Sequence, residues 1–550
     1  MGSRSPRTKR SDVQRYNVMV ATRDGAGLAT DLYLPPGDGP FPAVVGRTPY
    51  NKNQAAFAGL AAGVNAKGYA LVVQDVRGRG DSDGTFEPYV NDGRDGYDMI
   101  EWIAEQSWSD GNVIYRGASY GARAGWMVGL EHPPHLRAMV IVVSPSDPFV
   151  EFPTCATTPM MLSWFRLTDG RLVQNTGGID WMKAYEHLPL MTMDEAAGFS
   201  STHWRDAMTH TSLDDYWAPR CYQDRYAHFD VPVLHISGWY DDEQIGTPKN
   251  YIGMTSQSPA ADGQRLLMGP WGHGVNSTSK LGEVDFGPSA VIDMEGYIAQ
   301  WLDGVTGRAS TDIPRVRIFV MGRNEWRDEN EWPLARTKFT DYFLHSGGSA
   351  NSRYGDGVLT LEAPPDEPPD EFTYDPARPV PFITEPTSSQ LGGPDDYSAV
   401  EQRGDVLCFT TEPLDDDLEI TGPVKLVLYA SSDAVDTDFA AKLVDVHPNG
   451  FCQRLCDSII RARYRNGVAK AEFMEPGTVY EFEIDMWNTS QVFKAGHRIR
   501  LEVTSSAFPK YDRNLNTGED IGTGTRMAIA TNRVWHNAEH PSRLVLPVIG

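Results

Sequence analysis

Short, continuously apolar runs alternate with segments of helical periodicity in the first part of the chain. The apolar runs lie at residues 42–46, 68–75, 112–116 and 138–143, and the helical segments lie at 98–105 and 122–130. Strands that are apolar along their whole length are buried on both faces, which is typical of a parallel sheet covered by helices. The pattern predicts that residues 1–145 form the first part of an α/β domain.

The pattern changes at about residue 146. From 146 to 230, aromatic and methionine side chains are dense, their spacing is helical, and no strand-like run occurs. Apolar strand runs resume at 231–238, 264–269 and 315–321, with a helical segment at 290–302. We therefore expect a helical cap over 146–230, inserted into an α/β domain whose second part covers 231–336.

Beyond residue 336 the helical periodicity largely disappears. Short runs of β-forming residues follow one another at 424–430, 439–444, 480–486, 498–504 and 543–548. Short strands separated by turns are typical of a β-sandwich. We expect residues 337–550 to form a separate, all-β domain.

The net charge excludes one class of partner. The 550 residues carry a formal net charge of −25, so the chain lacks the basic surface that nucleic-acid binding needs. No run approaches the roughly 18 apolar residues of a membrane span, and residues 1–14 lack the apolar stretch of a signal peptide. The five cysteines are odd in number and sparse, which implies no disulfide framework. We expect a cytoplasmic location without a membrane partner, and the sequence leaves homo-oligomerisation open.

Residues 117–121 have the sequence Gly-Ala-Ser-Tyr-Gly, a G-x-S-x-G motif between a predicted strand and a predicted helix. In a nucleophile elbow the serine lies on a sharp strand-to-helix turn, and small residues on either side let the backbones approach. The N-terminus of the following helix brings N–H groups and a positive dipole to the reaction centre. This context makes Ser119 the candidate nucleophile.

A serine nucleophile needs a base, and after such an elbow the acid and then the histidine follow along the chain. Asp241 follows the strand run at 231–238 and His273 follows the run at 264–269. Both therefore leave the carboxyl edge of the sheet, where sites in open α/β sheets lie. We expect His273 to act as the general base and Asp241 to orient it, although spacing alone leaves Asp242 as an alternative acid.

Four segments together resemble one family of serine hydrolases. They are Arg-Thr-Pro-Tyr-Asn-Lys at 47–52, Asp-Val-Arg-Gly-Arg-Gly-Asp-Ser-Asp-Gly at 75–84, Gly-Trp-Tyr-Asp at 238–241 and Gly-Pro-Trp-Gly-His at 269–273. These segments are similar to motifs of the cocaine esterase and X-prolyl dipeptidyl aminopeptidase family of α/β hydrolases, which includes α-amino-acid ester hydrolases and glutaryl-cephalosporin acylases. The resemblance implies an α/β-hydrolase domain, a helical cap and a C-terminal jelly roll, and it favours Asp241 as the acid.

The resemblance also implies an oxyanion hole made of one tyrosine hydroxyl and one backbone N–H. The hydroxyl carries over to Tyr50 and the amide to Tyr120. A preorganised donor of this kind stabilises the tetrahedral intermediate by about 3 kcal/mol.

Bulky and charged side chains near the predicted site are candidates for substrate binding. The aromatic ones are Trp164, Phe165, Trp239 and Trp271. In α-amino-acid ester hydrolases a carboxylate cluster receives the substrate's ammonium group; Glu243 resembles one member of that cluster, but Gln244 stands where a second carboxylate would be.

We expect the chain to hydrolyse a small carboxylic ester, with a bulky or aromatic acyl group, through an acyl-serine intermediate. Amide or peptide hydrolysis, including release of X-Pro dipeptides, is the alternative within enzymes. A catalytically idle protein whose β-sandwich binds a ligand is the alternative outside them. No H-E-x-x-H, paired C-x-x-C or Walker motif occurs, so we expect no metal and no organic cofactor.

Overall fold

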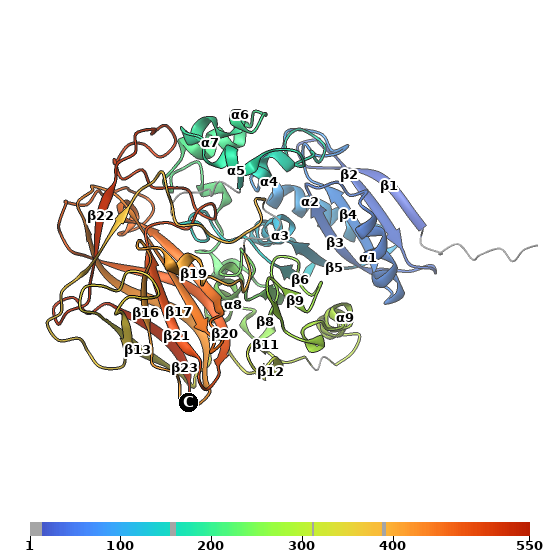
Figure 1. Cartoon of the computed structure of the whole chain (residues 1–550). Helices are drawn as coiled ribbons and strands as arrows, with labels where there is room; N and C mark the ends of the chain where they lie inside the picture. The colour runs from blue at the N-terminus through green and yellow to red at the C-terminus, as the bar shows by residue number, and fades with distance from the viewer. Residues whose placement is uncertain (1–13, 154–160, 311–312, 388–391) are drawn as a thin grey trace, which may run out of the picture.

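The structure, a computed structural model, describes residues 14–153, 161–310, 313–387 and 392–550 (Figure 1). Among these residues, one ten-stranded sheet forms the centre of the N-terminal half of the chain. In spatial order the strands are β1 (Gln14–Ala21), β2 (Gly27–Leu34), β4 (Ala70–Asp75), β3 (Phe41–Thr48), β5 (Ser109–Ala118), β6 (Leu136–Val142), β7 (Val233–Gly238), β8 (Arg265–Gly269), β11 (Val316–Val320) and β12 (Glu325–Glu329). In this spatial order the strands from β4 through to β11 run parallel to one another, whereas β1, β2 and β12 pair antiparallel with their neighbours.

Helices cover both faces of this sheet (Figure 1). They are α1 (Ala55–Ala66), α2 (Asp92–Ala104), α3 (Tyr120–Leu130), α8 (Gly246–Gln257) and α9 (Met294–Val305). Successive side chains of a strand point to opposite faces, and those of β4 divide between two hydrophobic cores. Ala70 and Val72 pack with α2, α3 and α8, whereas Leu71 and Val73 pack with α1 and α9.

A cap of short helices lies between β6 and β7 in the sequence. It contains α4 (Met161–Leu167), α5 (Trp181–Tyr185), α6 (Met193–Ala196) and α7 (Thr202–Thr209), with 3-10 turns η1 (Leu190–Thr192), η2 (Ala218–Arg220) and η3 (Tyr226–His228). The aromatic and methionine side chains of the cap share one core with Ala440, Ile459, Phe508 and Tyr511 of the C-terminal domain. The cap is therefore fixed to that domain by buried apolar contacts.

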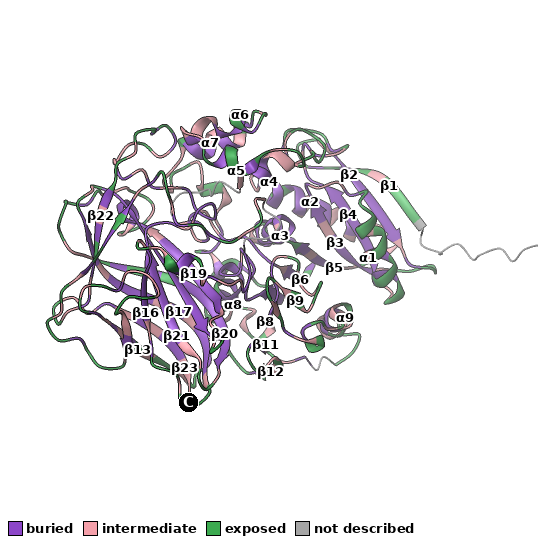
Figure 2. Ribbon diagram, viewed as in Figure 1, coloured by how far each residue is buried: buried purple, intermediate pink, exposed green. Residues whose placement is uncertain are grey.

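The C-terminal domain is an all-β sandwich with one large hydrophobic core, purple in Figure 2. In spatial order its strands are β15 (Asp370–Tyr374), β22 (Ala530–Trp535), β17 (Leu418–Ser432), β23 (Arg543–Ile549), β13 (Thr337–His345), β14 (Val358–Thr360), β16 (Leu407–Thr410), β21 (Arg498–Thr504), β18 (Asp438–Val446) and β19 (Cys452–Arg461), and β20 (Tyr480–Phe493) pairs with β17. The ribbon of β9 (Lys280–Leu281) and β10 (Val284–Asp285) and the 3-10 turns η4 (Ala261–Gly263), η5 (Pro288–Ala290), η6 (Val400–Gln402) and η7 (Ala462–Tyr464) lie in the connections.

The predicted fold, an α/β-hydrolase domain with a helical cap followed by an all-β domain, is confirmed. The apolar pattern missed the β1–β2 hairpin and the helices α1 and α8, and it placed the start of α2 at residue 98 rather than Asp92. The first turns of α2 contact α3 through glycines instead of an apolar stripe: a Cβ atom on Gly96 would lie 2.2 Å from the side chain of Val128. The first sheet ends with β12 and the second begins with β13, and the predicted boundary at residue 336 falls between them. Among the described residues, no helix has both the length and the apolar character needed to cross a membrane.

Candidate active site

Ser119 lies at the turn from β5 into α3, with a φ of 54° and a ψ of −126°. A non-glycine residue adopts such a positive φ only where the surrounding structure enforces it, as in a nucleophile elbow. The glycines beside it have a steric role. A Cβ atom on Gly117 would lie 2.2 Å from the carbonyl oxygen of Gly121, so larger residues would force the turn open.

The structure brings Ser119, His273 and Asp241 together although 154 residues separate the serine from the histidine. The Oγ atom of Ser119 lies 3.0 Å from Nε2 of His273, and Nδ1 of His273 lies 2.8 Å from Oδ1 of Asp241. Asp241 is buried, and its Oδ2 accepts a hydrogen bond of 2.6 Å from Ser237. This chain of contacts lets the imidazole take the serine proton while the buried carboxylate fixes its tautomer.

A second carboxylate lies beside the same imidazole nitrogen. Oδ1 of Asp242 is 3.1 Å from Nδ1 of His273, slightly farther than the oxygen of Asp241. Asp242 also contributes to the wall of the cavity described below. The shorter contact belongs to Asp241, whose side chain is fully buried, which matches the role of an orienting acid.

The two carboxylates and Glu243 change the protonation of the base. Burial by itself disfavours the charged imidazole, but the negative charges of Asp242 and Glu243 and the hydrogen bonds to the two aspartates outweigh it, so the pKa of His273 is raised well above 6.5. Burial also raises the pKa of Asp241. Burial opposes ionisation of Asp242 as well, yet the charge of His273 holds the pKa of Asp242 below its usual value.

The two predicted oxyanion donors lie at the same site. Tyr50 and Tyr120 line one cavity with Ser119, and Tyr120 is the first residue of α3, where backbone N–H groups have no acceptor within the helix. The hydroxyl of Tyr50 accepts a hydrogen bond of 2.8 Å from Nε1 of Trp164. Burial raises the pKa of Tyr50 above 10, so the hydroxyl keeps the proton that it would donate to an oxyanion.

A cavity of about 570 Å³ opens over the nucleophile. Its floor holds Ser119 and His273, and the cap supplies the predicted residues Trp164 and Phe165. Further aromatic side chains of the wall are Tyr89, Phe149, Phe152, Tyr216 and Trp217. Predominantly apolar walls with a few polar groups are typical of a site for a small ligand.

Trp239 and Trp271 lie away from this wall, in contrast to the substrate contacts that the sequence predicted. Both are buried in the hydrophobic cores of the sheet domain, and their indole N–H groups donate to the carbonyl oxygens of Phe319 and Ala290, each over 2.8 Å. The ring of Trp271 packs over Gly269, where a Cβ atom would lie 2.3 Å from the ring. The two tryptophans therefore support the loops that carry Asp241 and His273.

Two glutamates belong to the otherwise largely apolar cavity wall. The predicted Glu243 lies there, and so does Glu151, which belongs to no recognisable motif. Burial raises the pKa of Glu243 well above its usual value and raises the pKa of Glu151 to about 8. The Oε2 atom of Glu243 is buried without a hydrogen-bond partner among the described residues. Glu151 is one acidic residue in an aromatic-rich segment, and no spacing rule marks it in the sequence.

The C-terminal domain braces the loop that carries the acid. The side-chain amide of Gln244 donates to the carbonyl oxygen of Asn488, and its Oε1 accepts a hydrogen bond of 3.3 Å from the backbone N–H of Asn488. The hydroxyl of Tyr240 donates to the carbonyl oxygen of Arg454 over 3.3 Å. Both contacts flank Asp241 in the sequence, so the all-β domain helps to fix the predicted catalytic acid.

The fold, the elbow and the triad define a serine hydrolase of the α/β-hydrolase class. The sequence profile of the X-Pro dipeptidyl-peptidase (S15 family) matches residues 24–275, and that of the X-Pro dipeptidyl-peptidase C-terminal non-catalytic domain matches residues 308–545. The chain is 37% identical to a cocaine esterase of Rhodococcus sp., over 97% of this chain and 98% of the relative. The chain belongs to the family of the cocaine esterases and X-Pro dipeptidyl-peptidases, and it is a serine ester hydrolase.

Two solved structures have the same overall architecture. An aminopeptidase from a marine sediment Thaumarchaeota archaeon superposes with a TM-score of 0.88 and 28% identity, over 100% of this chain and 98% of that chain. An α-amino acid ester hydrolase superposes with a TM-score of 0.85 and 26% identity, over 99% and 98% of the two chains. The similarity therefore extends over all three parts of the chain, including the cap and the C-terminal domain.

Proposed function

We propose that the enzyme acts on small carboxylic esters whose acyl group is bulky and apolar. The observation that supports this is the cavity of about 570 Å³ whose wall beside Ser119 is built from aromatic side chains of the cap. Burial of an aromatic acyl group against such a wall contributes roughly 25 cal/mol for each Å² removed from water. An acetyl group would leave most of this surface uncovered.

The geometry supports a two-step reaction. Ser119 attacks the ester carbonyl while Nε2 of His273 takes its proton, and Asp241 stabilises the imidazolium. The hydroxyl of Tyr50 and the amide of Tyr120 donate to the oxyanion. The alcohol leaves with the proton from His273, and a water molecule activated by the same imidazole then hydrolyses the acyl-serine and restores the enzyme.

A series of p-nitrophenyl esters tests the acyl preference. We expect kcat/KM for the benzoyl and phenylacetyl esters to exceed that for the acetyl ester by roughly tenfold or more, the effect of about 1.4 kcal/mol of extra burial. The Phe165→Ala variant should reduce this ratio, because Phe165 belongs to the wall, while turnover of the acetyl ester changes less. A preference for acetyl over both aromatic esters contradicts the proposal.

A second candidate, an ester or amide with a free α-amino group in its acyl part, is favoured by one observation. Glu151 and Glu243 both line the cavity, and the buried Oε2 of Glu243 has no hydrogen-bond partner among the described residues. A buried carboxylate gains most from a charged partner, and a substrate ammonium would supply one. Two of the similar structures are an aminopeptidase and an α-amino acid ester hydrolase, which supports this candidate.

Paired substrates that differ only by the amino group separate the two candidates. The phenylglycine and phenylacetic esters of the same alcohol provide such a pair, and an Xaa-Pro anilide adds the amide case. Under the second candidate the amino ester is preferred at least about tenfold, and Glu243→Gln abolishes that preference without changing turnover of the phenylacetic ester by a similar factor. Equal rates for the two esters, unchanged in Glu243→Gln, favour the first candidate.

We also propose a cytoplasmic location. Cys221, Cys408, Cys452 and Cys456 are free thiols, and three of them are buried; Cys155 lies outside the described residues. Unpaired cysteines are typical of a reducing compartment. Fractionation of cells that produce the protein, followed by thiol counting under denaturing conditions, tests the assignment.

A further inference from the structure

Two imidazoles and a carboxylate meet at one end of the C-terminal sandwich, outside the hydrolase site. Asp445 is on β18 and His447 follows its last residue, and residues two apart on a strand share a face. His497 directly precedes β21, which pairs antiparallel with β18 so that Val446 faces Arg498. The register therefore places His447 opposite His497, with Asp445 on the same side.

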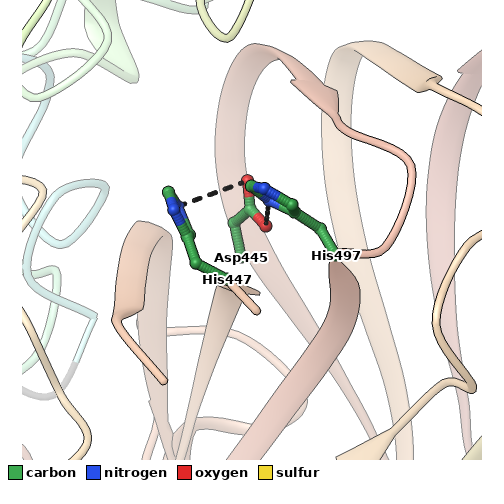
Figure 3. A group of neighbouring side chains, drawn as sticks. All are labelled: Asp445, His447 and His497. Carbon is green, nitrogen blue, oxygen red and sulfur yellow. Dashed lines mark hydrogen bonds and ion pairs between the residues drawn. The ribbon is translucent and has the colours of Figure 1, made fainter. Parts of the chain in front are cut away.

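The side chains converge as the register requires. Figure 3 shows the rings of His447 and His497 both turned toward the carboxylate of Asp445. Nδ1 of His497 lies 2.8 Å from Oδ1 of Asp445, and Nε2 of His447 lies 3.9 Å from Oδ2. One ligand atom from each of the three residues lies within 4.8 Å of the others. The group thus offers two nitrogens and one oxygen within the span of a metal site.

A fourth donor lies next to this group. Gln453 is on the neighbouring strand β19, and its Oε1 lies 3.2 Å from Nε2 of His447. In a tetrahedral site with metal–ligand bonds of about 2.0–2.1 Å, neighbouring ligand atoms are about 3.3 Å apart. The contacts of 2.8 Å (His497 to Oδ1 of Asp445), 3.2 Å (His447 to Gln453) and 3.9 Å (His447 to Oδ2 of Asp445) lie on both sides of that value, so side-chain rotations would be needed to bring the ligand atoms around one ion.

We propose that Asp445, His447 and His497 bind a divalent transition-metal ion, with Zn²⁺ as the best match, and that the amide oxygen of Gln453 or a water is the fourth ligand. Imidazole nitrogen with one carboxylate suits Zn²⁺, whereas Ca²⁺ and Mg²⁺ prefer oxygen ligands. With two neutral imidazoles and one carboxylate as ligands, a divalent ion forms a complex with a net charge of +1. The acidic chain, whose formal net charge is −25, favours that positive charge.

The surroundings of the carboxylate are those of a metal ligand. Asp445 is 1% exposed, and its Oδ2 accepts a hydrogen bond of 3.0 Å from Nε2 of Gln491, which orients it. The two histidine side chains are 26% and 14% exposed, so an ion and a water can reach the group from solvent. Binding of an ion would join the ends of β18 and β21. Gln453 also links the group to the hydrolase domain, because its Nε2 donates a hydrogen bond of 3.3 Å to the hydroxyl of Tyr240.

Binding is tested on the untagged full-length chain after dialysis against a chelator. Titration with Co²⁺ should give a visible absorption band of a four-coordinate site with one ion per chain, and Zn²⁺ should displace it. His447→Ala and His497→Ala should each weaken Zn²⁺ binding on the order of 100-fold or more, since even changes around ligands cost 10–100-fold. Zn²⁺ should raise the Tm of the wild-type chain and not that of these variants.

Two further variants make the outcome unambiguous. His228→Ala removes an exposed histidine elsewhere and should bind as the wild type does. The group Asp241, Asp242 and His273 also offers three ligand atoms, so His273→Gln must retain the cobalt band. The proposal is overturned by an absent band in the wild type, by a band that persists in both His447→Ala and His497→Ala, or by a band lost in His273→Gln.

Discussion

The indole N–H of Trp164 donates a hydrogen bond of 2.8 Å to the hydroxyl oxygen of Tyr50. Trp164 is on the cap helix α4 and Tyr50 is on the loop after β3, so the bond joins the cap to the oxyanion site. An indole N–H can only donate, and the Tyr50 oxygen is therefore the acceptor. The tyrosine hydroxyl does not use its own proton in this bond, and that proton is the one it would donate to the oxyanion.

Loss of this bond should slow the chemical step. We expect Trp164→Phe, which keeps an aromatic ring, to lower kcat roughly 10-fold with a smaller change in KM, whereas Tyr50→Phe should cost about 10²–10³-fold in kcat. Trp217→Phe is the matched control, because Trp217 lines the same cavity and donates instead to His210. Steady-state kinetics with a p-nitrophenyl ester measures all three, and an unchanged kcat in Trp164→Phe contradicts the assigned role.

The two aspartates beside His273 should differ in their effect. Asp241→Asn replaces the buried acceptor at 2.8 Å and permits the wrong imidazole tautomer, so we expect kcat to fall by about 10⁴-fold. Asp242→Asn should reduce kcat far less, because the Asp241 contact remains. Fluorophosphonate labelling, which Ser119→Ala should abolish, should likewise be slowed much more by Asp241→Asn than by Asp242→Asn. Equal losses in both variants would mean that the carboxylates share the role.

The pH profile should report the charges around the base. The neutral imidazole is the active form, so activity is lost as the pH falls through the pKa of His273, which the neighbouring carboxylates raise well above 6.5. Glu243, whose own pKa burial raises, contributes to the raised pKa of His273 in its ionised form, and Glu243→Gln removes that contribution. We therefore expect the acid limb of kcat/KM to move to lower pH in Glu243→Gln. A limb that stays in place, or moves upward, contradicts this explanation.

Chelation should leave catalysis intact. The nucleophile is activated by an imidazole 3.0 Å away and the oxyanion by protein donors, so no step of the proposed reaction needs a metal. We expect kcat/KM for an aromatic ester to be unchanged after dialysis against EDTA. Loss of activity that a single added metal restores would place an ion in the reaction itself.

Features that follow from local sequence could be predicted, and those that arise from tertiary packing could not. The elbow, the acid and the histidine each end or follow a recognisable apolar strand, so order and spacing were enough to nominate Ser119, Asp241 and His273. Trp239 and Trp271 lie in the same loops, but Trp271 is buried by packing over Gly269 and Trp239 by a core shared with β11, which no local pattern reveals. Glu151 and the Asp445 group lacked a sequence signal for the same reason, because partners far apart in the chain define them.

The contact between Gln244 and Asn488 places different constraints on its two residues as the sequences of relatives diverge. Gln244 must supply a side chain that both donates and accepts, whereas residue 488 takes part in this contact only through its peptide group, so its side chain is constrained by burial and not by this hydrogen bond. Recombination between relatives near residue 336 should therefore require that the incoming domain keeps the register of β20 as well as the apolar contacts that it makes with the cap. Activity of such chimaeras measures this directly, and a one-residue slip in β20 should inactivate them.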